Sequence, residues 1–186
     1  MNYRETDFLK PLDQVLMPDS RCLYSFPNAD SALQAHYGFV SKIVLNEHVH
    51  NDVKLQFETA KNAFLYSFFV YRLAMMAVHQ AIAATELALR RMIGDPEKER
   101  KETFKPLLQK AHDKGLIDVK KIRPDLEIEE FKKFLGDFRN DLSHGTHTLM
   151  PPPVMIMFIE DCAHILNQLF ENAHTQQLKP SWNAWV

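Results

Sequence analysis

The sequence predicts an all-α protein, an antiparallel bundle of four to five helices, and two observations carry this prediction. Along most of the chain, apolar residues recur at spacings of three and four, which is the period of a helix that buries one face. Prolines and glycines fall between these periodic segments, where helices begin and end. The 186 residues suit one domain, because two domains would each need a core and no boundary separates them.

The first half of the chain predicts two helical segments. One helix starts near residue 28 or 30 and continues to about Leu45. After a polar turn, a helical run extends from about Asp52 to Ile93, where a glycine and a proline stop it. This run is longer than a usual globular helix, so it can be kinked or broken. The aromatic cluster Phe64–Tyr71 has strand propensity, but its flanks are helical and we predict helix there.

The second half predicts three further helices. A short helix fits Thr103–Lys114, with Thr103 as its N-cap and Gly115 at its end. The next fits Glu127–His144, which has apolar residues on one face and Gly145 as a C-terminal cap. The last begins at the prolines of residues 151–153 and continues to about residue 173. Its predicted buried face consists of Met155, Phe158, Ile159, Cys162, Ile165, Leu166, Leu169 and Phe170.

Two terminal segments lie outside the predicted bundle domain of residues 29–175. Residues 1–28 form an irregular arm, because three prolines interrupt any helix and no period persists. This arm packs on the core or mediates association. Residues 176–186 form a tail whose Trp182 and Trp185 need cover from the bundle or from a second subunit.

Composition and charge exclude several classes of protein. Lys and Arg total 22 and Asp and Glu total 24, so the net charge of −2 excludes a wholly basic nucleic-acid coat. Two cysteines are too few for a disulfide scaffold and fit a reducing cytoplasm. The longest uncharged run in the most apolar region, Leu73–Thr85, is shorter than the ~20 residues of a membrane-spanning helix. No export signal opens the chain, so we expect a cytoplasmic protein with no membrane partner.

Charge is distributed unevenly along the chain. Residues 90–123 hold 11 basic and 6 acidic side chains, whereas residues 124–186 hold 4 and 9. The basic stretch is either a solvated connector with a mixed-charge surface or a rim that contacts phosphate.

The most informative stretch is Arg139-Asn140-Asp141-Leu142-Ser143-His144, at the end of a predicted helix. Arginine offers a fixed cation with a donor fork suited to phosphate. Histidine transfers protons near neutral pH, and Asn140 lies four residues before His144, where it can orient the ring or a substrate. These groups fit metal-free RNA cleavage, in which a 2′-hydroxyl attacks its own phosphate.

The spacing of the arginine and the histidine raises a geometric question. Five residues separate them, which is about 140° around an ideal helix, so they do not converge on one phosphate. Either Gly145 lets the last turn unwind, or two copies of the motif meet across the axis of a symmetric dimer.

The stretch Arg139–His144 resembles the R-x4-6-H signature of the HEPN superfamily, including the asparagine preferred after the arginine. The resemblance covers roughly residues 30–173, and within it only the six-residue motif is specific. The segment Ala77–Ile93, which contains Glu86-Leu87-Ala88-Leu89-Arg90, is similar to an earlier bundle helix of such proteins.

This resemblance implies a four-helix bundle, usually dimeric, with the motif near the dimer cleft. Many members are metal-independent endoribonucleases of toxin–antitoxin, phage-defence or RNA-processing systems, and some pair with a nucleotidyltransferase antitoxin. Arg139 and His144 would then be catalytic, with Asn140 supporting them. Other members bind a nucleotide, RNA or a protein partner without catalysis, so a non-catalytic helical module is the alternative.

A second set of polar residues belongs to the apolar helical run. Arg72, His79 and Glu86 are spaced by seven and form one stripe on the helix. Buried charge needs a partner or a cavity. The stripe is either an internal Arg–Glu pair, or an edge that faces water, or a substrate-binding lining of the cleft that holds Arg139 and His144.

The sequence contains no motif for a zinc site, a phosphate-binding loop or a cysteine nucleophile. The histidine pairs His48/His50 and His144/His147 form no recognisable zinc pattern. The scattered glycines make no phosphate-binding loop, and Cys162 lies on an apolar helix face. We therefore expect no metal and no cofactor.

Overall fold

The computed structural model describes residues 8–23, 29–93, 102–145 and 149–178. Within these ranges the chain forms helices, turns and loops, and no strand. This confirms the all-α class predicted from the helical periodicity. The helices are η2 (Leu12–Gln14), α1 (Ser20–Leu23), α2 (Ala29–Ser41), α3 (Asn51–Tyr66), α4 (Leu73–Ile93), α5 (Phe104–Asp113), α6 (Val119–Ile122), α7 (Ile128–Ser143) and α8 (Pro152–Thr175).

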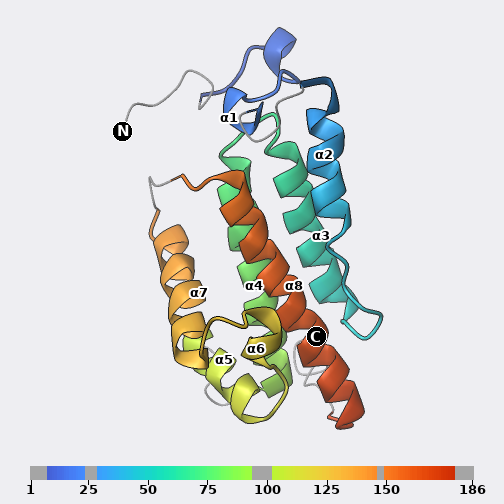
Figure 1. The fold of residues 1–186 in the computed structure, drawn as a ribbon, viewed down its shortest axis with the longest axis vertical. Coiled ribbons are helices and arrows are strands. Elements are labelled where there is room, and N and C mark those ends of the chain that lie inside the picture. The colour runs from blue at the N-terminus through green and yellow to red at the C-terminus, as the bar shows by residue number, and fades with distance from the viewer. Residues whose placement is uncertain (1–7, 24–28, 94–101, 146–148, 179–186) are drawn as a thin grey trace.

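The long helices run along the long axis of the molecule and alternate in direction as the chain proceeds (Figure 1). In the view of Figure 1, α2 descends, α3 ascends and α4 descends again. The short helices α5 and α6 lie at the lower end, after which α7 ascends and α8 descends. Helix α4 packs most extensively on α3 and α8 and also contacts α5 and α7. It is therefore the central helix of the structure.

The predicted core faces are buried. Every residue of the face expected on α8 is at most 5% exposed. On α7, the residues at the predicted spacing that face the core most fully are Phe131, Leu135 and Phe138. Phe134 is 37% exposed, and its ring still stacks on Phe158 with centroids 4.6 Å apart. Helical periodicity therefore identified which sides of α7 and α8 face inward.

The long helical run expected over residues 52–93 is broken in two. Residues 67–72 form consecutive turns between α3 and α4, so the prediction of helix for the whole aromatic cluster Phe64–Tyr71 is wrong. The Ser67 hydroxyl donates to the Phe64 carbonyl over 2.6 Å, which competes with helical hydrogen bonding. Phe68 and Tyr71 remain buried, because the reversal folds both rings into the core.

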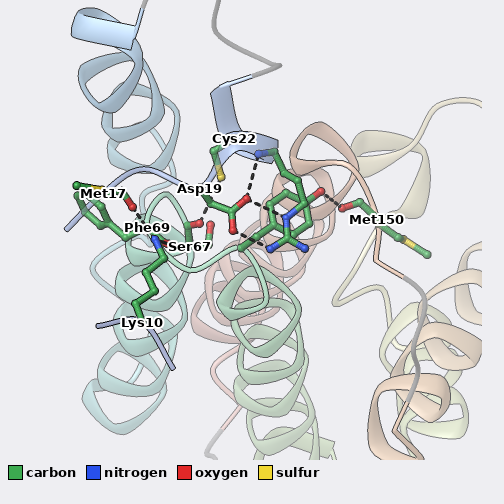
Figure 2. A network of polar contacts seen from close by, with 9 residues as sticks. Lys10, Met17, Asp19, Cys22, Ser67, Phe69 and Met150 are labelled. Atoms are coloured by element: carbon green, nitrogen blue, oxygen red, sulfur yellow. Dashed lines mark hydrogen bonds and ion pairs between the residues drawn. The ribbon is translucent and has the colours of Figure 1, made fainter. Parts of the chain in front are cut away.

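The described part of the N-terminal arm packs on this α3–α4 turn (Figure 2). Three consecutive carbonyls of the turn accept hydrogen bonds from the arm. The Cys22 thiol donates to the Ser67 carbonyl over 3.3 Å, and the Asp19 amide donates to the Phe68 carbonyl over 2.8 Å. The Lys10 ammonium donates to the Phe69 carbonyl over 2.7 Å. The arm thus satisfies carbonyls that the end of α3 leaves without helical partners.

One buried carboxylate organises the arm. Asp19 is 0% exposed and accepts two hydrogen bonds from the Arg21 guanidinium, at 2.8 Å and 2.7 Å (Figure 2). The guanidinium carbon lies 4.5 Å from the centre of the Tyr71 ring, whose hydroxyl donates to the Met150 carbonyl over 2.7 Å. The arm is therefore linked through the turn to the segment that precedes α8. Instead of being irregular throughout, it contains the short elements η2 and α1.

Several expectations concern residues outside the described ranges. The tryptophans of the tail, Trp182 and Trp185, belong to this group. So do Gly94 and Pro96, the glycine and proline expected to stop the helical run, and His147. The expected cap residue Thr103 does precede α5, although its side chain makes no capping hydrogen bond. In the parts of the chain that are described, no helix has both the length and the apolar character needed to span a membrane.

Candidate functional site

The motif residues lie at the C-terminal end of α7. A capping box formed by Glu127 and Glu130 starts this helix, since each side chain bonds the backbone of the other residue. Helical geometry ends at Ser143, His144 is the C-cap, and Gly145 adopts a positive φ of 78°. Glycine takes this left-handed conformation without the steric cost of a Cβ, so the predicted cap at Gly145 is confirmed.

Arg139 binds the acidic residue of the predicted stripe. Its Nε and Nη2 both donate to Oε2 of Glu86 over 3.2 Å. The other oxygen of the same carboxylate, Oε1, accepts from Nη2 of Arg90 over 2.5 Å. Glu86 is 8% exposed, and a carboxylate this buried needs paired charge. Two guanidiniums from two helices thus share one carboxylate, and the cluster keeps one net positive charge.

His79, the histidine of the stripe, also contacts α7, at a residue four positions after Arg139. Nε2 of His79 lies 3.4 Å from Oγ of Ser143, and the Ser143 hydroxyl donates to the Arg139 carbonyl over 2.9 Å. His79 and Glu86 are seven residues apart on α4, and Arg139 and Ser143 are four residues apart on α7. Helices α4 and α7 are therefore joined by two side-chain contacts, Glu86 with Arg139 and His79 with Ser143.

Asn140 and His144 are both exposed. The Asn140 side-chain oxygen accepts from Nη1 of Arg139 over 3.4 Å, and its backbone carbonyl accepts from the His144 amide over 2.9 Å. Within the described ranges, no hydrogen bond or ion pair holds the His144 imidazole, so the orienting role expected for Asn140 stays a prediction. The ring is open to solvent and to any ligand that approaches this end of α7.

The structure addresses one of the two geometric alternatives for the motif. The His144 amide bonds the Asn140 carbonyl in the helical i to i−4 pattern, so the backbone does not unwind before the histidine. Arg139 and His144 therefore keep the angular separation of about 140° that an ideal helix gives them. The other alternative, a meeting of two copies, stays a prediction.

The third member of the predicted stripe lies off the helix. Arg72 sits in the turn before α4 and is half-buried, so seven-residue spacing on one helix describes only His79 and Glu86. Sequence reasoning missed two residues of the cluster, Arg90 and Ser143. Arg90 follows Glu86 by four residues and Ser143 follows Arg139 by four, a spacing that already placed each pair on one helix face.

The described part of the basic stretch of residues 90–123 is largely neutralised within the protein. Six of its described cations make ion pairs with carboxylates of the same chain. The pair between Arg123 and Asp161 is bidentate, with contacts of 2.9 Å and 3.1 Å from Nε and 2.9 Å from Nη2. These contacts favour the solvated mixed-charge connector over a rim that contacts phosphate. The paired residues are Arg90, Arg91, Lys105, Lys110, Lys120 and Arg123.

A hollow of about 480 Å³ lies along another side of α7 and is a poor site for an anion. Its floor is aromatic, formed by Phe134, Phe138 and Phe158, whereas Glu130, Asp137 and Asp141 supply carboxylates. One lysine, Lys133, faces these carboxylates and lies 3.5 Å from Asp137. Phosphate would be repelled here, so on α7 the Arg139 side is the better place for an anion. The residues that line this hollow are Glu130, Lys133, Phe134, Asp137, Phe138, Asp141, Met150 and Phe158.

The described residues contain no group of three or more His, Cys, Asp or Glu side chains arranged to hold a metal ion. Comparison of the chain with protein-family models, with curated protein sequences and with solved structures finds no match to any of them. The candidate site is therefore defined by the geometry of the cluster around Arg139.

Proposed function

We propose that this protein is a HEPN-like, metal-independent endoribonuclease that acts as a symmetric dimer. The observation that carries the proposal is the placement of Arg139. Its guanidinium is paired with Glu86 from α4 through Nε and Nη2, and its side chain is 32% exposed. An arginine fixed in this way presents a positioned cation to solvent, which is what a phosphodiester requires.

The proposed reaction is cleavage by the neighbouring 2′-hydroxyl. This hydroxyl loses its proton and attacks the adjacent phosphorus, while the bond from phosphorus to the 5′-oxygen breaks. Arg139 stabilises the negative charge that develops on the phosphoryl oxygens. His144 transfers a proton, and Asn140, bonded to Arg139, supports the orientation of the guanidinium.

The proposed dimer follows from the angle between the two motif residues. The last turn of α7 stays helical as far as the amide of His144, so one chain directs Arg139 and His144 to different sides of α7. A two-fold axis beside this helix end brings the histidine of one copy toward the arginine of the other. The resemblance further suggests a nucleotidyltransferase or other antitoxin as a protein partner.

The test is an RNA cleavage assay. Purified protein is incubated with total RNA and with tRNA in the presence of EDTA, beside Arg139→Ala, Arg139→Lys and His144→Ala. We expect both alanine variants to lose at least about a hundredfold in rate, because each removes a group that acts in the transition state. Arg139→Lys keeps the charge and loses the donor fork, so we expect an intermediate rate.

The design includes a control for fold and one for charge. Arg139→Ala leaves Glu86 paired with Arg90, so circular dichroism and thermal unfolding should show a folded variant. Lys133→Ala removes a 77%-exposed cation elsewhere on α7 and should cleave like wild type. Equal cleavage by all variants would place the activity outside this cluster. Folded wild type that cleaves no RNA would favour the alternative, a non-catalytic module that binds nucleotide, RNA or protein.

A further inference from the structure

We infer that His79 is a second catalytic histidine, the general base of the cleavage reaction, rather than a residue that only binds substrate. This inference rests on the proposed ribonuclease function and assigns one of its two proton transfers. Cleavage by a 2′-hydroxyl requires a base for the attacking oxygen and an acid for the leaving oxygen. The R-x4-6-H motif supplies one histidine per chain, so the second proton transfer needs either the same residue of the second copy or another group of the fold.

The helix geometry places His79 against the face of α7 that carries Arg139. Arg139 and Ser143 are four residues apart, about 40° around α7, so they share a face. His79 contacts Ser143 on that face with Nε2 3.4 Å from Oγ, whereas His144 is displaced by about 140° from Arg139. Within one chain, His79 is therefore the histidine that the described contacts place beside Arg139.

The hydrogen bonds at Ser143 favour the tautomer of His79 in which Nε2 carries the proton. The Ser143 hydroxyl uses its one hydrogen to donate to the Arg139 carbonyl over 2.9 Å. Toward His79 the hydroxyl oxygen can therefore only accept, so Nε2 of the imidazole is the donor. In the neutral ring, Nδ1 is then the unprotonated nitrogen, and no described residue bonds it. The side chain is exposed, so Nδ1 is open to a substrate hydroxyl.

The proton transfers balance with two histidines. Nδ1 of His79 takes the proton of the 2′-hydroxyl as the 2′-oxygen forms its bond to phosphorus. The bond from phosphorus to the 5′-oxygen breaks, and the leaving oxygen takes a proton from the imidazolium of His144. The products are a 2′,3′-cyclic phosphate and a 5′-hydroxyl, and no oxidant, metal or second substrate is consumed.

Charged and titratable residues flank this contact in the sequence of both helices. Arg72, in the turn before α4, and Glu86, on α4, each lie seven residues from His79, and on α7 Arg139 and Asp141, with the C-cap His144, lie within four residues of Ser143. Glu86 is already shared by two guanidiniums, so the nearest carboxylate of the cluster does not pair with His79. Ser143 is the residue for which a contact to His79 is described.

The experiment compares pH–rate profiles of His79→Gln, His144→Ala and wild type on an RNA that wild type cleaves. For wild type we expect kcat/KM to follow a bell-shaped pH dependence. His79→Gln should lose about a hundredfold in rate together with the acidic limb, because that limb reports deprotonation of the base. His164→Gln, an exposed histidine on α8, is the matched control and should keep the wild-type profile.

A modified substrate separates the two histidines further. In the same RNA with sulfur in place of the 5′-oxygen at the cleaved bond, the leaving thiolate needs no proton. We expect this substrate to restore much of the rate of His144→Ala and little of the rate of His79→Gln.

Two results would overturn the inference in distinguishable ways. If His144→Ala abolishes cleavage while His79→Gln keeps both the rate and the acidic limb, His79 is not the base and the proposed ribonuclease function stands. If wild type cleaves no RNA, the proposed function and this inference fail together.

Discussion

At the scale of single residues, Glu86 holds the two arginines of the candidate site in place. Its carboxylate is buried between two guanidiniums, one on its own helix and one that lies 53 positions later in the chain. The sequence indicated that a charged residue on an apolar helix needs a partner or a cavity, and a place in the motif cleft was one of the alternatives for Glu86. It could not identify Arg139 as that partner, because a contact between distant segments depends on how α4 and α7 pack.

A second buried polar residue, His36, makes the stability of the protein depend on pH. His36 is 2% exposed, its Nε2 lies 2.9 Å from the Phe64 carbonyl, and its ring stacks on Phe64. Burial lowers the pKa of His36 below 6.5, and the hydrogen bond to the Phe64 carbonyl offsets this only in part. The unfolded chain therefore takes up a proton near pH 6.5 that the folded chain binds only at lower pH.

We predict that this histidine makes the protein less stable as the pH falls from about 6.5 through the lowered pKa of the folded state. Each pH unit between the two pKa values removes at most about 1.4 kcal/mol. Urea unfolding at several pH values between 5 and 7.5 measures the effect, and His36→Gln, which keeps a donor for the Phe64 carbonyl, should flatten the curve. Parallel curves for the two proteins would contradict the prediction.

Asp161 changes the stability with pH in the opposite direction to His36. The pH dependence of wild type therefore has to be compared with that of His36→Gln. Burial raises its pKa to about 6, against the lowering effect of its pair with Arg123. A raised pKa adds stability that is fully present below the unfolded value of 3.8 and is lost as the pH rises through about 6. The difference between wild type and His36→Gln cancels this contribution, because both proteins contain Asp161.

At the scale of elements, the sequence predicted most of the helix limits, but it did not predict the chain reversal between α3 and α4. Apolar period, prolines and Gly145 placed α5, α7 and α8 to within a few residues, because these signals act within one or two turns. The turns at residues 67–72 contain neither proline nor glycine. They are held by hydrogen bonds from the arm, about fifty positions earlier in the chain.

The arm is therefore an element of the fold, and its buried aspartate should be needed for stability. Burial acts to raise the pKa of Asp19, but the hydrogen bonds and charge of Arg21 outweigh it and hold the pKa below 3.8. The stabilisation by ionised Asp19 is present above the unfolded value and is lost as the pH falls through the lower folded value. At pH 7 it is fully present.

We predict that Asp19→Asn lowers the free energy of unfolding at pH 7 by about 2 kcal/mol, because charge-assisted hydrogen bonds to Arg21 are lost from a buried site. Thermal and urea unfolding measure the change. Asp13→Asn removes an exposed carboxylate of the same arm and should have little effect. Similar losses in both variants would show that net charge, and not the buried contact, stabilises the arm.

At the scale of the whole molecule, charge is segregated in sequence and mixed in space. The net charges of +5 over residues 90–123 and −5 over residues 124–186 suggested separate basic and acidic regions. In the fold, Lys105 and Arg123 of the first region pair with Asp137 and Asp161 of the second. The fold brings these segments together, so among the described residues the linear charge pattern overstated the extent of unpaired basic surface.

The burial of both cysteines gives the molecule two chemical reporters in different places. Burial raises the pKa of both the Cys22 and the Cys162 thiols to about 12, so the native protein should react slowly with thiol reagents. Cys22 lies on the arm, whereas Cys162 lies in the middle of α8. Labelling of Cys22 requires only release of the arm, and labelling of Cys162 requires the helices to separate.

We therefore expect Cys22 to be modified faster than Cys162, and Asp19→Asn to accelerate Cys22 alone. Mass spectrometry of peptides from timed alkylation measures both rates in one sample. Equal rates would mean that the arm and the helices open as one unit. Labelling kinetics would in this way report how independently the N-terminal segment detaches from the protein it covers.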